Sequence, residues 1–200
     1  MVLLEASTKL GGTWSRDRVY SGLITHNSIG ALEVSDTPLE DGRPTEEGYI
    51  RGEDVAAYLE GFAERYGLVE RTVFGARVES IDRDGSTREW VLKLREQAEE
   101  VRCEKLIMAT GLTSMPFIPG DIPITDPKMV MFHSAELKKW EEVILAEEVE
   151  RVTIYGGSKS AFDTAYMCAA AKKKVDWIIR DSGQSVSVSF MNSMVPANSH

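Results

Sequence analysis

Hydrophobic and polar residues follow two different periods along this 200-residue chain, and each period predicts its own kind of element. In one stretch, apolar side chains recur at three- and four-residue spacing, which predicts an amphipathic helix. Its apolar face consists of Val55, Tyr58, Leu59, Phe62 and Tyr66. Gly67 follows as a C-terminal stop, so we expect the helix to end there.

Segments of β type follow this helix. Residues 72–81 and 89–94 are expected to form two strands, joined by residues 82–86, whose Asp-Gly pair is typical of a hairpin turn. Residues 105–109 are a third apolar run and predict a buried strand that ends at Thr110-Gly111.

Two other regions are less regular. The short apolar run Val2–Glu5 suits the end of a buried strand, and residues 10–45 are rich in Gly, Ser, Thr, Pro and Asp, which predicts a long ordered loop region. Ser134 is expected to cap a second helix, which runs through Leu137 and Ile144.

The last regular region predicts a complete β-turn-α-β unit. Residues 151–155 form a strand, residues 156–161 a turn, residues 161–171 an alanine-rich helix and residues 175–180 a second strand. The unit is about 30 residues long, which is the size of one mononucleotide-binding half of a dinucleotide-binding fold.

Composition narrows the class of protein. The chain is 42% hydrophobic and 28% charged, which is typical of a globular protein, and its net charge of −9 argues against nucleic acid as the main partner. It has no apolar run long enough for a transmembrane segment, and Glu5 comes too early for a signal peptide. Cys103 and Cys168 are expected to be reduced thiols in a cytoplasmic protein.

The turn after residue 155 is the strongest local sign of chemistry. Small residues between a strand and a helix let the backbone approach a pyrophosphate, and the N–H groups at the helix start favour its negative charge. The pattern here is Gly156-x-Ser158-x-x-Ala161, which is short of a full G-x-G-x-x-G. Taken alone it is a weak signal for nucleotide binding, and the alternative is a plain tight turn into a helix.

Two strand-end residues extend this interpretation. Arg180 ends the second strand of the unit, where an arginine accommodates the 2′-phosphate of NADPH, and Lys159 could add a second cationic contact. Glu5 ends the first apolar run, where an acid binds a cofactor ribose. The alternatives are a surface arginine and an exposed strand-end charge.

A series of short motifs resembles, in order and spacing, the flavin-containing monooxygenases, and the fungal members are the most similar. The series covers nearly the whole chain and is specific in combination. It comprises Glu5 followed by Leu10-Gly11-Gly12-Thr13-Trp14, Thr25-His26-Asn27-Ser28, Ser35-Asp36-Thr37-Pro38, Ala109-Thr110-Gly111 and Gly156-Gly157-Ser158-Lys159-Ser160-Ala161.

The resemblance implies FAD and NADPH as cofactors and gives roles to the matched positions. Glu5 binds the adenosine ribose of FAD, the Gly-Gly-x-Trp loop lines the flavin, and Ala-Thr-Gly closes the FAD site. Asn27 is the catalytic candidate beside the isoalloxazine ring, although physical chemistry alone makes it a loop or turn residue. The implied cofactor-binding set is Glu5, Gly11, Gly12, Thr13, Trp14, Asn27, Val78, Ala109, Thr110, Gly111, Gly156, Gly157, Ser158, Lys159, Ser160, Ala161 and Arg180.

A further family stretch matches only around Phe132-His133-Ser134. His133 is therefore either a family position or simply a polar residue at a helix start.

The resemblance also implies a fold and an activity. The fold is α/β, a partial Rossmann-like FAD/NAD(P) flavoprotein architecture with two dinucleotide-binding domains. Residues 1–125 are expected to be a partial FAD domain without its first strand and glycine turn, and residues 126–200 the N-terminal part of the NADPH domain. The activity is that of an N,N-dimethylaniline monooxygenase, which uses NADPH and O2 to oxygenate an amine or sulfide without a metal.

We expect this chain, as a piece truncated at both ends, to bind FAD poorly and to have impaired activity. Two alternatives remain open at this point. One is a Baeyer-Villiger monooxygenase that oxygenates ketones, and the other is a non-catalytic nucleotide-binding fragment.

Overall fold

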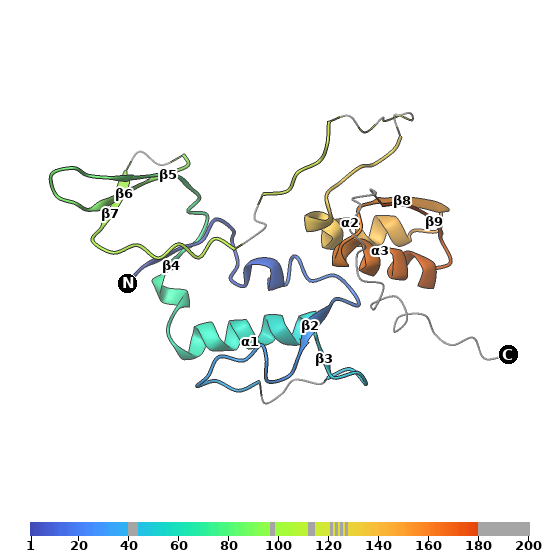
Figure 1. Ribbon diagram of the computed structural model, residues 1–200, viewed down its shortest axis with the longest axis horizontal. Coiled ribbons are helices and arrows are strands. Elements are labelled where there is room, and N and C mark those ends of the chain that lie inside the picture. The colour runs from blue at the N-terminus through green and yellow to red at the C-terminus, as the bar shows by residue number, and fades with distance from the viewer. Residues whose placement is uncertain are drawn as a thin grey trace. The chain divides into compact units, whose positions relative to one another are not determined.

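The computed structural model describes residues 1–39, 44–96, 99–111, 115–120, 122, 124, 126 and 128–179. The chain divides into two compact units, residues 1–139 and residues 140–200 (Figure 1). This boundary falls inside helix α2 (Leu137–Leu145). The division at residue 125 into two cofactor domains stays a prediction.

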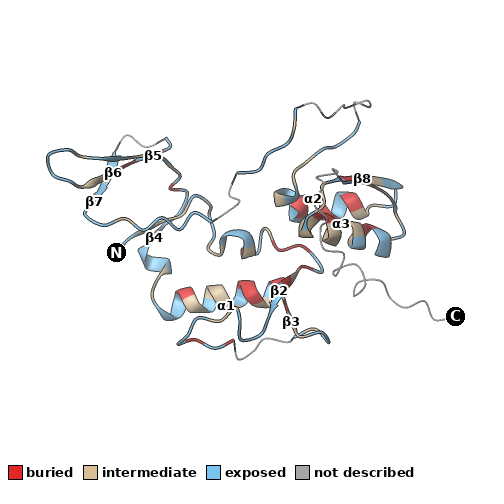
Figure 2. Cartoon of the chain, viewed as in Figure 1, coloured by how far each residue is buried: buried red, intermediate tan, exposed pale blue. Residues whose placement is uncertain are grey.

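The first unit is built around helix α1 (Gly52–Arg65), which confirms the predicted amphipathic helix. The helix follows directly after strand β3 (Tyr49–Arg51), which pairs antiparallel with strand β2 (Ile24–Ser28). Three buried residues of α1, Gly52, Val55 and Ala56, lie in its first turns near β2, and a fourth, Ala63, lies near its C-terminal end (Figure 2). Gly67 follows the helix with a left-handed φ of +57°, so the predicted stop is confirmed.

The core of this unit is small and apolar. Leu39, Ile50 and Val55 are its buried centre. Four partly buried side chains pack against this centre, namely Trp14, Leu32, Tyr58 and Leu59. The start of the helix is closely packed, because a Cβ on Gly52 would lie 2.9 Å from Val19 Cγ1 and would require that side chain to shift.

A short parallel pair ties the N-terminus to the segment that follows α1. Strand β1 (Leu3–Leu4) pairs with β4 (Thr72–Val73), which follows the 3-10 turn η2 (Val69–Arg71). The predicted strand over residues 72–81 is therefore interrupted. Gly75 has a φ of +69°, a conformation that strands do not adopt, and it separates β4 from the next strand.

The next three strands form an antiparallel sheet in the order β5 (Val78–Arg83), β6 (Trp90–Leu94) and β7 (Glu100–Cys103). The hairpin between β5 and β6 is confirmed. The predicted buried strand at residues 105–109 is wrong, because this stretch is extended without strand pairing and the Ile107 side chain is 85% exposed. The ladder ends earlier because Trp90, the first residue of β6, pairs with Cys103.

The start of α2 corrects one predicted cap. His133, not Ser134, is the capping residue, and its Nδ1 accepts a hydrogen bond from the Ala135 backbone N–H at 3.1 Å. Ser134 begins the 3-10 turn η3 (Ser134–Glu136) that leads into α2. A ring nitrogen does here what the serine hydroxyl was expected to do, which supports the interpretation of His133 as a polar residue at a helix start.

The second unit confirms the predicted β-turn-α-β arrangement. Strand β8 (Arg151–Tyr155) pairs in parallel with β9 (Lys174–Ile178), and helix α3 (Lys159–Ala170) connects them and contacts both strands (Figure 1). The register places Ile154 beside Trp177. Among the described residues, no helix is long and apolar enough to cross a membrane.

Candidate functional site

The glycine turn between β8 and α3 has the backbone geometry that a phosphate site needs. Gly156 has a φ of +128°, and its amide donates to the Ile178 carbonyl at 3.0 Å, so the turn is fixed to the end of β9. A Cβ on Gly157 would lie 3.0 Å from Ile179 Cγ2, so a larger residue there would require the Ile179 side chain to shift. At Gly156 a Cβ position has no atom within 4 Å, so that side of the turn is open.

The first turn of α3 is suited to an anion. Ser158 is the N-cap residue, and its hydroxyl makes no capping hydrogen bond to the N–H groups of the helix start. No acidic residue lies in that first turn. Ala161 is buried where the motif requires a small residue, which lets α3 pack closely on the strands.

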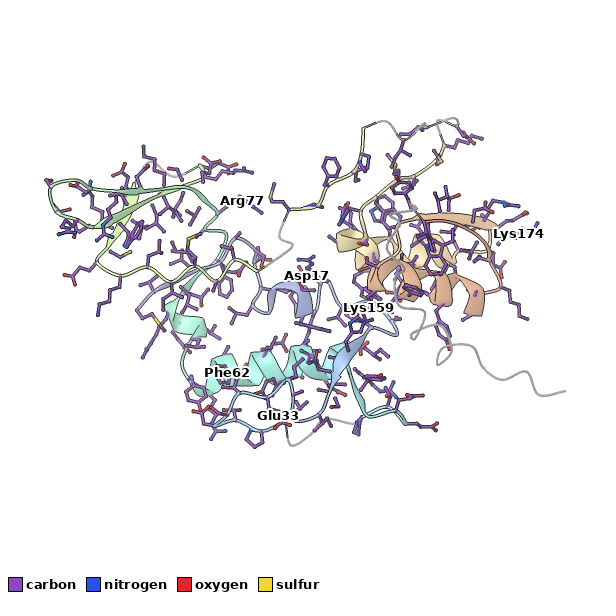
Figure 3. The ribbon with its side chains drawn as sticks, viewed as in Figure 1. Asp17, Glu33, Phe62, Arg77, Lys159 and Lys174 are labelled. Atoms are coloured by element: carbon purple, nitrogen blue, oxygen red, sulfur yellow. The ribbon has the colours of Figure 1, made fainter. Side chains whose placement is uncertain are left out.

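Lys159 and Ser160, which lie between these positions, both contact residues one turn further along the helix. Lys159 Nζ lies 2.5 Å from Asp163 Oδ2, one turn further along, and both side chains are largely buried. The Ser160 carbonyl accepts a hydrogen bond from the Thr164 hydroxyl at 2.7 Å. Lys159 therefore has a protein carboxylate as its partner in the free protein, and its contact with a nucleotide stays a prediction. Figure 3 shows Lys159 where α3 begins.

Sequence reasoning missed one residue at this turn. The indole Nε1 of Trp177, on β9, donates a hydrogen bond to the Gly156 carbonyl at 2.6 Å. The sequence pattern alone did not predict this contact. The feature that could have indicated it is an aromatic residue on the second strand of the unit, next to the glycine turn. Arg180, the predicted 2′-phosphate ligand, lies outside the described residues and stays a prediction.

The Gly-Gly-x-Trp loop in the first unit forms the 3-10 turn η1 (Gly12–Trp14). Gly11 has a φ of +103°, and a Cβ there would lie 3.1 Å from the Ser15 backbone nitrogen, so the loop requires glycine at this position. Gly12 and Thr13 are exposed. Trp14 packs against the apolar core, which anchors the loop.

A charged pair fixes the same loop to the helix. The Arg16 guanidinium contacts both carboxylate oxygens of Glu60 on α1, with the shortest distance 2.7 Å. The neighbouring carboxylate raises the pKa of Arg16. Because the pair is exposed, it mainly sets the orientation of the loop and contributes little stability.

Glu5 lies directly after β1, as predicted for a strand-end acid. Its carboxylate accepts a hydrogen bond from the Ser7 backbone N–H at 2.7 Å, and its own backbone bonds to Val73 and Ala76. Val78 begins β5 two residues after Ala76, so these two predicted cofactor residues lie in one region of the unit. The role of Glu5 as a ribose ligand stays a prediction.

Asn27 lies on β2, and its side chain is exposed. The strand is irregular here, because the pairing with β3 shifts between Ile24 and Ser28. The buried hydroxyl of Thr25 bridges this irregularity. It donates to the Asn27 carbonyl at 2.5 Å and accepts from the Ile50 backbone N–H at 3.0 Å. Thr25 is thus a second residue, after Trp177, that supports a predicted site residue and that sequence reasoning did not identify.

The Ala-Thr-Gly motif is the least supported part of the predicted site. Ala109, Thr110 and Gly111 are exposed and lie outside helices and strands, and Gly111 has a φ of +76°. By contrast, Trp14 packs against the core cluster that contains Ile50, and the Thr25 hydroxyl accepts a hydrogen bond from the Ile50 backbone N–H.

Cysteine and metal chemistry give no competing site in the part of the chain that the structure describes. No group of three or more His, Cys, Asp or Glu side chains is placed to hold a metal ion there. Cys103 and Cys168 are both free thiols. Burial raises the pKa of the Cys168 thiol, although Lys173 acts in the opposite direction.

The sequence of the chain matches a known protein family and several of its relatives. Residues 4–199 match the model of the pyridine nucleotide-disulphide oxidoreductases. An FAD-dependent monooxygenase of Fusarium langsethiae is 34% identical over 185 residues, which cover 92% of this chain and 31% of the relative. One from Aspergillus sclerotiorum is 34% identical over 188 residues, covering 92% of this chain and 33% of the relative. The chain thus spans about a third of the length of these relatives.

Solved structures share the fold. OTEMO in complex with FAD and NADP has a TM-score of 0.74 at 23% identity, covering 90% of this chain and 34% of that one. Cyclohexanone monooxygenase from Rhodococcus sp. Phi1, bound to NADP+, has a TM-score of 0.65 at 22% identity, covering 89% and 32%. The predicted α/β flavoprotein architecture is confirmed.

Proposed function

This chain belongs to the pyridine nucleotide-disulphide oxidoreductase family, and we propose that it is an FAD-dependent monooxygenase that uses NADPH and O2. The substrate we propose is a soft nucleophile, an amine or a sulfide. The fungal relatives named as FAD-dependent monooxygenases support the reaction class. The observation that carries the proposal is the open, uncapped glycine turn at Gly156, which fits a dinucleotide pyrophosphate.

The chain's own residues have distinct tasks in this proposal. FAD, when bound, supplies the redox and oxygen-transfer chemistry. The Gly156 turn and the start of α3 bind the pyrophosphate of NADPH, and Lys159 contributes a cation. Glu5 holds the adenosine ribose of FAD, and the loop at Gly12 and Trp14 lines the flavin. Asn27 donates a hydrogen bond beside the isoalloxazine ring.

The first test measures NADPH binding by the purified chain with isothermal titration calorimetry. We expect binding of NADPH, and we expect Lys159→Ala to weaken it by roughly tenfold, the usual effect of one charge-assisted hydrogen bond. Lys174→Ala is the matched control, because Lys174 is an exposed lysine at the opposite end of the same unit (Figure 3). A wild-type chain that fails to bind NADPH would contradict the proposed function.

The second test concerns flavin and substrate. A visible spectrum of the chain incubated with FAD, before and after NADPH, shows whether flavin is held and reduced. The weak FAD binding expected from the sequence stays a prediction, which this spectrum tests. Turnover of a tertiary amine would favour the proposed substrate class. Turnover of a cyclic ketone would favour the Baeyer-Villiger alternative. NADPH binding without flavin binding or turnover would favour a non-catalytic nucleotide-binding fragment. A cytoplasmic location also remains part of the proposal.

A further inference from the structure

The peptide that joins Gly156 to Gly157 is controlled by a side chain from the neighbouring strand. Its carbonyl oxygen accepts the indole N–H of Trp177 at 2.6 Å. All peptide bonds of the described residues are trans, so the N–H of Gly157 points opposite to that carbonyl. Fixing the carbonyl toward Trp177 therefore fixes the Gly157 N–H away from Trp177.

The indole itself is held from two directions. Its backbone is fixed by the parallel register that places Trp177 beside Ile154. Its ring meets the ring of Phe162, on α3, edge to face, with centroids 4.7 Å apart and planes at 84°. Strand and helix thus both restrain the donor, which has little freedom to leave the Gly156 carbonyl.

The orientation of this peptide matters for an anion. A carbonyl oxygen that faced a pyrophosphate would repel its negative charge, whereas an N–H would attract it. From this geometry we infer that Trp177 is a positioning residue of the nucleotide site, which keeps the Gly156 carbonyl turned away from the phosphates of NADPH. The inference rests on the proposed binding of NADPH.

The inference assigns the effect to the indole N–H and not to the packing of the ring, so the test must distinguish the two. Trp177→Phe keeps an aromatic ring against Phe162 and removes the donor. Phe162→Leu is the matched control, because it removes the ring contact and keeps the donor. Replacing the Trp177 indole by benzothiophene through amber suppression is a second variant, which deletes the N–H and preserves the shape if Trp177→Phe does not fold.

The measurements are NADPH affinity by calorimetry, thermal stability, and the indole N–H signals in a nitrogen-15 NMR spectrum. We expect the donor-deleting variants to bind NADPH about tenfold more weakly, which corresponds to the loss of one hydrogen bond. Phe162→Leu should lower the Tm with a smaller change in affinity. The Trp177 indole signal, assigned by its absence from Trp177→Phe, should exchange slowly with solvent and shift when NADPH binds.

Each outcome decides the inference. Unchanged NADPH affinity in both donor-deleting variants would overturn the inference. It would also be overturned if Phe162→Leu lost as much NADPH affinity as the donor-deleting variants while having the same Tm as they do, since ring packing alone would then explain the loss. Both results would leave the proposed function intact. Failure of the wild-type chain to bind NADPH would overturn the proposed function and this role together.

Discussion

A single buried hydroxyl, that of Thr25, connects two strands where β2 departs from regular pairing. It serves the Asn27 carbonyl on its own strand and the Ile50 amide on the neighbouring one. Because Ile50 is fully buried, its backbone N–H has no access to water as a substitute partner. The position of Asn27 therefore depends on Thr25, whose hydroxyl holds the Asn27 carbonyl.

Thr25→Val tests this dependence, since valine keeps the shape of threonine and removes the hydroxyl. We expect the free energy of unfolding in urea to fall by about 1–3 kcal/mol, because a buried donor is left unpaired. Thr153→Val, at an exposed threonine on β8, is the matched control and should change it by less than about 0.5 kcal/mol. Equal stability of the two variants would refute the role of the hydroxyl.

Asp84 is a second residue whose surroundings define its chemistry. Its carboxylate accepts hydrogen bonds from Ser86, Thr87 and Arg102, and these hold its pKa well below the usual range. A depressed pKa in the folded state means that the contribution to stability is fully present above about pH 4, near the ordinary value. It is lost as the pH falls through the folded value.

We therefore expect an NMR titration of the Asp84 carboxyl signal to show no protonation until well below pH 4. Amide protection of the hairpin between β5 and β6 should decline in the same pH range, and Asp84→Asn should remove that dependence. Asp82→Asn, which changes an exposed carboxylate on the adjoining strand β5, serves as the control. An ordinary titration midpoint for Asp84 would show that the hydrogen bonds do not stabilise its charge.

At the level of elements, the loop at η1 depends on backbone conformation more than on side-chain contacts. Gly11→Ala places a Cβ against the Ser15 backbone at a positive φ, so we expect a loss of about 1–3 kcal/mol of stability. Gly61→Ala makes the same chemical change inside α1, where no atom lies within 4 Å, and should stabilise the chain by about 0.5–1 kcal/mol. Thermal melts of both variants measure this difference in stability. Equal stability of Gly11→Ala and Gly61→Ala would show that the loop accepts the extra Cβ without strain.

The elements also show what the sequence could predict. Helix α1 and the β8-α3-β9 unit follow from periodic apolar spacing and lie where it placed them. Strands β2 and β7 were missed for physical reasons. Strand β2 is polar over most of its length, with the sequence Ile-Thr-His-Asn-Ser, so it lacks the alternation that marks a half-buried strand. Strand β7 does alternate, with the sequence Glu-Val-Arg-Cys, but at four residues it is too short for the alternation to stand out.

The candidate site also has parts that the sequence predicted and parts that it did not. The Gly156 turn and the Gly11 loop are local, and short motifs were enough to find them. The hydrogen bonds that support them join residues far apart, namely Trp177 to Gly156 and Thr25 to Ile50. No local pattern encodes such a pairing, because it depends on strand register in the folded chain.

On the scale of the whole molecule, the stretch between β7 and η3 contrasts with the regular elements on either side of it. Its described residues form no helix or strand, and several large apolar side chains are exposed, with Ile107 at 85%, Met115 at 77% and Phe117 at 76%. Exposed, extended backbone is the preferred substrate of proteases.

We therefore expect limited thermolysin digestion to cut first at Ile107 or Phe117, as identified by mass spectrometry of the early fragments. Ile50 and Ile154 are internal controls, because they offer the same type of side chain in buried positions. Initial cleavage within α1 or β8 would show that these elements open more readily than the exposed stretch.

The pairing of β1 with β4 sets an order of events when the chain folds. Leu3 and Thr72 are partners although 69 residues separate them, whereas Arg151 and Lys174 are only 23 residues apart. Closing a long loop costs more entropy and slows folding, so contacts between near neighbours form first. The β8-α3-β9 unit should therefore assemble faster than the β1-β4 pair. Strand β1 pairs only after the chain has brought β4 across the 69 residues between Leu3 and Thr72.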